Sequence, residues 1–193
     1  MRHFILVLFI MLSFAASAQQ KTKYIYAGLS DKSVSLTPFY KVFGSSFDPA
    51  ITLGGGMDYI QKGNSYLFQL IEGTAYSTKL IGQGITFSTS IGYRYKMESG
   101  LYAEILLGLG TSVFSPSRET FSLDENERYE RVNPIRAILG APVDLAAGYQ
   151  SGKYAFYLKY RYMIEGTYTD ILPILPTSLL GCGIRYQLGR MND

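Results

Sequence analysis

Apolar and polar side chains alternate along most of the chain beyond its first 20 residues. The clearest stretch is 85–96, where aliphatic and aromatic residues hold most odd positions and Ser, Thr, Gly, Arg and Lys hold the even ones. Residues 101–113 repeat this pattern. A period of two is typical of β-strands, because successive side chains point to opposite faces. We therefore predict an all-β protein.

Eight segments share this alternation or the composition of a strand. They are residues 24–29, 51–61, 66–76, 85–96, 101–113, 135–149, 154–164 and 178–188. The position of the first strand stays open, because 34–42 is also strand-like. Glu72 falls in phase with apolar Phe68 and Leu70, which predicts a bulge in 66–76. Pro142 cannot donate a backbone hydrogen bond, so we expect a bulge or a broken hydrogen bond there.

The connections between these strands alternate strictly between short and long. Residues 62–65, 97–100 and 150–153 have the composition of tight turns. The longer loops are 30–49, 77–83, 114–134 and 165–177. In an up-and-down barrel this order places the short turns and both termini on one rim and the long loops on the other. The pattern predicts a closed antiparallel up-and-down transmembrane β-barrel of about eight strands.

The N-terminus has the layout of a secretory signal peptide. Arg2 and His3 precede an apolar run over 4–14, and Ala16-Ser17-Ala18 forms a cleavage pattern. The run is shorter than the ~20 residues that a membrane-spanning helix needs. We therefore expect a cleaved signal at 1–18 and a single outer-membrane barrel domain at 19–193. Cys182 is the only cysteine, so no internal disulfide is expected.

Alternation alone does not say which face is the interior. A soluble barrel would turn its apolar face inward, and its charges would be solvated surface. A membrane barrel turns the apolar face to lipid and encloses the polar one. The charges on that polar face are Asp58, Arg94, Lys96, Glu104, Arg136, Asp144, Lys159, Arg161 and Arg185. These six bases and three acids are expected to form a network that plugs the lumen, because buried charges must pair or contact water.

Aromatic residues support the membrane model. The chain has 17 Tyr and 11 Phe, and seven of these tyrosines cluster beside the short turns or the C-terminal end. They are Tyr59, Tyr66, Tyr93, Tyr95, Tyr149, Tyr154 and Tyr186. Tyrosines gathered at one height around a barrel form an interfacial girdle, since their rings are apolar and their hydroxyls polar.

Together these features resemble the small bacterial outer-membrane β-barrel proteins, the group of OmpA- and OmpX-like eight-stranded barrels. Glycine-rich sequences within the predicted strands, as in residues 53–59 and 181–186, are part of the resemblance. The resemblance implies a location in the bacterial outer membrane and contact with outer-membrane lipid. Family members often end in an aromatic residue that helps their assembly, whereas here Tyr186 and Leu188 are followed by five further residues, Gly189 to Asp193.

The chemistry of the chain argues against catalysis. Its one histidine, His3, lies in the signal, so no His-dependent catalytic or metal site is expected in the mature chain, and no cofactor. Gly54-Gly55-Gly56 lacks the Lys and Ser or Thr of a phosphate loop and is interpreted as close packing. A net charge of +3 is too weak to indicate nucleic acid.

The loops offer the remaining candidate surfaces. Residues 118–131 are the most charged stretch, either a solvated external loop or a contact for a protein or surface-polymer partner. Residues 170–176 are unusually apolar for a loop. We predict a non-enzymatic integral outer-membrane protein with a structural or surface-interaction role. The alternatives are a narrow channel or small-solute transporter, and a soluble exported ligand-binding barrel.

Overall fold

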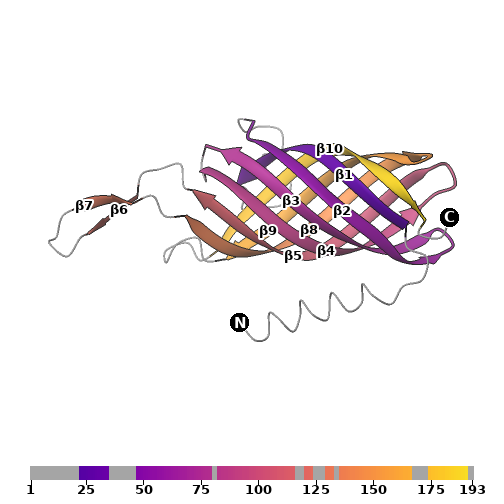
Figure 1. Ribbon diagram of the computed structural model, residues 1–193, viewed down its shortest axis with the longest axis horizontal. Helices are drawn as coiled ribbons and strands as arrows, with labels where there is room; N and C mark the ends of the chain where they lie inside the picture. The colour runs from indigo at the N-terminus through magenta and orange to yellow at the C-terminus, as the bar shows by residue number, and fades with distance from the viewer. Residues whose placement is uncertain are drawn as a thin grey trace.

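Eight long antiparallel strands close on themselves in the computed structural model, which describes residues 22–34, 47–79, 82–115, 120–123, 129–132, 135–166 and 174–190. Each strand is 13 to 17 residues long. They are β1 (Thr22–Val34), β2 (Pro49–Lys62), β3 (Ser65–Thr78), β4 (Gly82–Lys96), β5 (Leu101–Ser115), β8 (Arg136–Ser151), β9 (Tyr154–Gly166) and β10 (Ile174–Arg190). Neighbours in the chain are neighbours in the barrel (Figure 1), which confirms the up-and-down prediction.

Closure is made by β1 and β10, which pair from Thr22↔Arg190 to Val34↔Thr177. Every barrel strand therefore has a partner on both sides. In a bilayer this matters because no water is present to satisfy the backbone groups of an open sheet edge. No helix in the described residues is long and apolar enough to cross a membrane.

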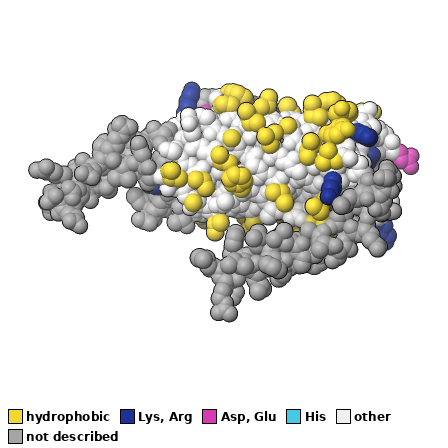
Figure 2. All heavy atoms as spheres, viewed as in Figure 1, with side chains coloured by type: hydrophobic (Ala, Val, Ile, Leu, Met, Phe, Trp, Pro, Cys, Tyr) yellow, Lys and Arg dark blue, Asp and Glu magenta, His cyan; other side chains and the backbone are white. Residues whose placement is uncertain are grey.

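The two faces of the sheet have opposite chemistry. Large apolar side chains cover the outside, among them Leu29 at 64% exposure and Leu107 at 63%. Figure 2 shows apolar side chains over the barrel wall and Lys and Arg mainly toward its ends. The inside holds Arg161 and Asp144, which are 3% and 0% exposed. This is the arrangement of a transmembrane barrel, and a soluble barrel would have the reverse.

Two predictions of irregularity had different outcomes. The bulge expected in 66–76 is wrong, because β3 pairs with β4 without any shift, and Phe68, Leu70 and Glu72 all point inward. The lumen of a narrow barrel needs apolar side chains as well as charges to fill it, so apolar and charged residues can both point inward from the same strand. The shift lies in β2 instead, where Asp58↔Phe68 is followed by Ile60↔Leu67.

The broken pairing expected at Pro142 is confirmed. The β5–β8 pairing runs to Leu107↔Val143 and resumes at Gly110↔Gly140 in the same register. On its other side Pro142 stays paired, opposite Met163 of β9. The interruption is therefore local and leaves the alternation of inward and outward side chains unchanged.

The lengths of the turns and loops at the two rims agree only in part with the prediction. The three short turns are confirmed, but the loop expected at 77–83 is not long, since β3 ends at Thr78 and β4 begins at Gly82. The 114–134 loop contains a hairpin of β6 (Thr120–Leu123) and β7 (Tyr129–Val132), which projects beyond the barrel (Figure 1). The first strand is Thr22–Val34. The signal at 1–18, residues 35–42 and most of 170–176 lie outside the described residues.

Candidate functional site: the barrel lumen

The half of the lumen nearer the short turns holds a cluster of four charges, here called the lower cluster: Asp58, Arg94, Glu104 and Arg185. Glu104 accepts hydrogen bonds from Arg185 Nη1 at 2.7 Å and Nη2 at 3.1 Å, and also from Arg94 Nε. Arg94 Nη1 lies 3.2 Å from an Asp58 carboxylate oxygen. One carboxylate is thus shared by two guanidinium groups, and the cluster is neutral as a whole.

Aromatic rings surround the lower cluster. The Arg185 guanidinium lies 4.6 Å from the ring centroid of Tyr24, and that of Arg94 lies 4.5 Å from Phe68. Such contacts stabilise a desolvated cation through the negative face of the ring. The buried apolar layer at this height consists of Tyr24, Tyr26, Phe68, Leu70, Tyr102, Leu106, Ala155 and Tyr157.

A second set of four charges, the middle cluster, lies deeper: Glu72, Asp144, Lys159 and Arg161. Arg161 binds Asp144 in bidentate fashion, with its Nε at 2.7 Å and its Nη2 at 2.6 Å from the two oxygens. Glu72 accepts from Lys159 Nζ at 2.8 Å, pairs with Arg161 and accepts the hydroxyl of Tyr26. This cluster is also neutral, and paired planar groups of this kind are among the strongest ion contacts in proteins.

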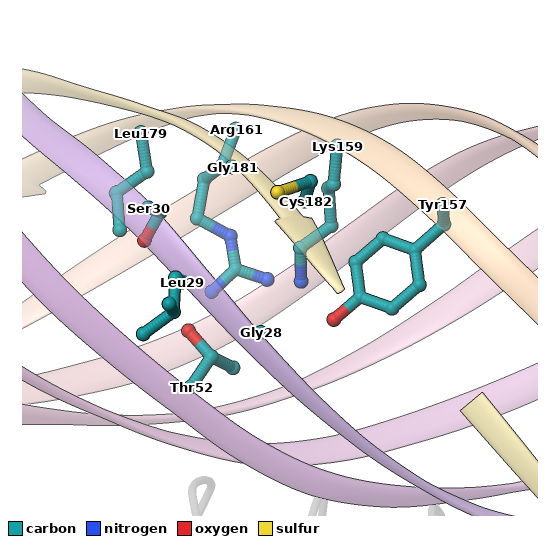
Figure 3. Close-up of a pocket in the computed structure, with 10 residues that line it drawn as sticks. All are labelled: Gly28, Leu29, Ser30, Thr52, Tyr157, Lys159, Arg161, Leu179, Gly181 and Cys182. Carbon is teal, nitrogen blue, oxygen red and sulfur yellow. The ribbon is translucent and has the colours of Figure 1, made fainter. Parts of the chain in front are cut away.

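Beside the middle cluster is a small cavity of about 20 Å³. Figure 3 shows the side chains of Tyr157, Lys159 and Arg161 reaching into it from β9, opposite Gly28 and Thr52. A volume of this size has room for about one water molecule. Among the described residues, side chains therefore fill the middle of the lumen and leave no solute-sized passage there.

A third charged group, the upper pair, lies toward the long loops. Lys32 Nζ is 3.7 Å from a Glu165 oxygen, and both side chains are 1% exposed. Glu165 also accepts the Ser112 hydroxyl at 2.6 Å, and the Lys32 ammonium lies 3.6 Å from the ring centroid of Tyr76. A second apolar layer fills the lumen at this height: Ala50, Tyr76, Phe114, Ile138, Leu175 and Leu179.

The structure brings together seven of the nine charges singled out in the sequence. Asp58, Arg94, Glu104, Asp144, Lys159, Arg161 and Arg185 all lie in the lower and middle clusters. The other two lie near the openings: Lys96 lines an open chamber of about 180 Å³ at the short-turn end of the lumen, and Arg136 is half-buried at the start of β8.

Sequence reasoning missed three charged residues of the lumen: Lys32, Glu72 and Glu165. Each is in phase with inward residues, Lys32 with Tyr24 and Tyr26, for example. Extending the alternation by a few residues at each strand end would have found Lys32 and Glu165. These three residues raise the nine charges singled out in the sequence to twelve, seven bases and five acids, and the three inner groups are each neutral.

The seven tyrosines of the proposed girdle do not all lie on the outer face of the barrel. Tyr93, Tyr95, Tyr149 and Tyr154 are 45–54% exposed on the outside, and the Tyr186 ring packs 5.1 Å from that of Tyr154. Tyr59, at the β2 register shift, donates its hydroxyl hydrogen to Gln69, a buried residue in phase with outward Leu67 and Ile71. Tyr66 differs, because it is in phase with Phe68 and lines the chamber inside the barrel, 5.8 Å from the Arg94 guanidinium.

The glycines of 54–56 serve packing, as interpreted from the sequence. A Cβ at Gly54 would lie 2.6 Å from the Tyr26 ring, and one at Gly56 would lie 2.5 Å from the Tyr24 ring. Gly55 points outward, and its nearest neighbour would be at 3.5 Å. The inward glycines thus make room for the tyrosines that surround the charges. In the described residues, no group of three or more His, Cys, Asp or Glu side chains could hold a metal ion.

Comparison with known proteins agrees on the architecture. No model of a protein family matches the chain, and no curated protein is significantly similar in sequence. Among solved structures, Neisserial surface protein A matches with a TM-score of 0.55 and 15% identity, over 88% of this chain and 99% of that one.

Two further structures are similar at lower scores. Ail, the attachment invasion locus protein of Yersinia pestis, has a TM-score of 0.46 and 14% identity, over 88% of this chain and 99% of Ail. The N-terminal barrel domain of Pseudomonas aeruginosa OprF has a TM-score of 0.47 and 12% identity, over 85% and 96%. At these identities the likeness concerns the fold: this chain has the closed eight-stranded transmembrane β-barrel fold of small bacterial outer-membrane proteins.

Proposed function

We propose that this protein is a non-enzymatic outer-membrane barrel that does not conduct solutes and that acts through its exposed loops. The observation that carries the proposal is the filled lumen. Three neutral charge groups and two apolar layers occupy it between the two openings. A barrel of eight strands has an interior just wide enough for side chains, so little space remains.

The ion pairs make the plug stable. Glu72, Asp144 and Arg161 are at most 3% exposed, and each has a charged partner. Removing one partner from such a group leaves an uncompensated buried charge, which costs several kcal/mol. Opening a passage by moving these side chains is therefore unfavourable, which argues against the narrow channel or transporter.

The proposed outer-membrane location is supported by the apolar outside of the barrel and by the sequence of the N-terminus. The apolar wall suits outer-membrane lipid as the direct partner. We expect export through a signal peptide cleaved between Ala18 and Gln19, which intact-mass measurement of protein from the outer-membrane fraction would test. Recovery in the soluble periplasmic fraction would instead support the soluble exported barrel.

The surface role rests on the asymmetry of the rims. The short turns gather on one rim, while the β6–β7 hairpin extends the opposite rim away from the wall (Figure 1). Loops held by a rigid scaffold commonly carry binding residues. A protein or a surface polymer is the kind of partner that this rim would meet, and the proposal names no single ligand.

Planar-bilayer recording tests the filled lumen. The wild-type protein is expected to give no stable conductance steps. Two variants extend the test: Phe114→Gly with Tyr76→Gly removes two lumen side chains of the upper apolar layer, whereas Phe87→Gly removes one side chain from the outside. Neither variant should conduct, because the lower and middle clusters still fill the lumen. Discrete, reproducible steps from the wild-type protein would overturn the proposal in favour of a channel.

A further inference from the structure

The opening at the short-turn rim widens into a chamber of about 180 Å³, several times the volume of the cavity beside the middle cluster. Residues from both ends of every short-turn hairpin reach it, so strands surround it on all sides. Its charged lining is Asp58, Arg94, Lys96, Lys153 and Arg185, and most of its neutral lining consists of Gln and Tyr side chains. This volume exceeds that of a single water many times and would admit a small polyatomic ion.

The charges of the chamber are unbalanced. Arg94 and Arg185 form its floor, where Asp58 and Glu104 compensate them. Lys96 and Lys153 stand nearer the opening, and within the described part of the chain neither ammonium has a carboxylate partner within 4.0 Å. Two positive charges therefore face the chamber without a matching acid. Lys96 is half-buried between low-dielectric walls, which strengthen its field on an anion inside, whereas Lys153 is exposed at the opening and acts more weakly.

One arginine in the floor of the chamber, Arg185, has a donor without an acceptor. The Nε of Arg185 is the one buried side-chain nitrogen or oxygen without a hydrogen-bond partner among the described residues. Its two terminal nitrogens are turned to Glu104, which Arg94 shares. The Nε itself is closed off from the chamber, so an anion there would stabilise this cation through its charge and not through a hydrogen bond to Nε.

From this geometry we propose that the chamber binds a soluble anion of the phosphate class, such as orthophosphate or pyrophosphate. Two unpaired ammonium groups match an ion of charge about −2, and several amide and hydroxyl donors can reach its oxygens. A single carboxylate would leave one lysine uncompensated. Because the chamber lies inside the ring of strands, a soluble ion has direct access, whereas lipid headgroups contact the outer wall.

The test is calorimetric titration of pyrophosphate into the full-length mature protein in a phosphate-free detergent at low salt. We expect saturable binding of one ion per barrel, with sulfate competing. Replacing both Lys96 and Lys153 by Ala should weaken it about tenfold or more. Lys62→Ala is the matched control, since Lys62 is an exposed lysine of the same rim that does not line the chamber.

A gain in affinity provides the second arm. Asp58 is the only carboxylate among the described residues that line the chamber, so Asp58→Asn should strengthen pyrophosphate binding. Heat-dependent gel migration would verify that every variant is still a closed barrel. Absence of saturable binding up to ~10 mM overturns the proposal. So does equal affinity in the double lysine variant and Lys62→Ala, or binding confined to a short-chain phosphatidic acid.

Discussion

At the scale of single residues, the lumen depends on a few shared partners. Glu104 is buried and receives hydrogen bonds from both Arg94 and Arg185. Neither arginine has another equally buried carboxylate, since Asp58 is more exposed. The stability of the lower cluster therefore depends more on Glu104 than on any other acid in it.

Replacing Glu104 by Gln should destabilise the folded barrel by about 3 kcal/mol or more, because one buried positive charge is left uncompensated. Glu98→Gln is the control, since Glu98 is exposed in the turn between β4 and β5. The chain has no Trp, so urea unfolding would be followed by gel migration or circular dichroism. Equal midpoints for the two variants would contradict the assigned role of Glu104.

Adjacent glycines separate packing from backbone propensity. Gly54→Ala should destabilise by about 1–3 kcal/mol, because its Cβ would enter the Tyr26 ring. Gly55→Ala should change stability by less than about 0.5 kcal/mol, because its Cβ points outward. The same urea titration measures both. A larger loss for Gly55→Ala would mean that the inward and outward faces are assigned the wrong way round.

At the scale of strands and hairpins, the barrel and the β6–β7 hairpin are separate units of pairing. Strands β5 and β8 pair directly up to Phe114↔Arg136, and the hairpin residues pair only with one another. The wall thus continues from β5 to β8 without help from the hairpin.

Replacing residues 117–134 by a short Gly-Ser linker should leave the closed barrel intact. Changing the length of a surface loop alters the free energy of unfolding by only about 1 kcal/mol. Heat-dependent gel migration and the urea midpoint would report this. A variant that no longer shifts on heating would show that the hairpin is needed for closure.

Sequence patterns predicted the strands better than the partners inside them. A period of two placed Arg161 and Asp144 on one face but could not tell which acid meets which base, since that depends on register between strands. Glu165 was missed because its strand continues past the apolar band. Tyr66 was assigned to the girdle by its height alone, although its phase with Phe68 directs it inward.

At the scale of the whole molecule, the orientation of the wall can be tested with the one native cysteine. Cys182 lies midway along β10 and faces outward. In water such a thiol would react readily, whereas in a bilayer it is shielded from polar reagents. The two environments therefore predict opposite behaviour for the same exposed side chain.

In lipid vesicles, Cys182 should react with a charged maleimide much more slowly than a cysteine placed at Glu98 by Glu98→Cys in a Cys182→Ala background. The expected difference is at least about tenfold, because a charged reagent enters hydrocarbon poorly. Both should react rapidly in urea. Similar rates in vesicles would mean that the apolar wall is not in contact with lipid.

The lower cluster draws its four side chains from β2, β4, β5 and β10, positions that span most of the chain. The β4–β5 hairpin carries Arg94 together with Glu104, but a β9–β10 hairpin that entered the bilayer alone would carry Arg185 into hydrocarbon without its carboxylate partner. Insertion and closure are consequently coupled: the chain has no inexpensive half-assembled state in the membrane. Insertion should therefore be one cooperative event. The last strand, β10, closes the wall and at the same time brings Arg185 to Glu104 in the lower cluster.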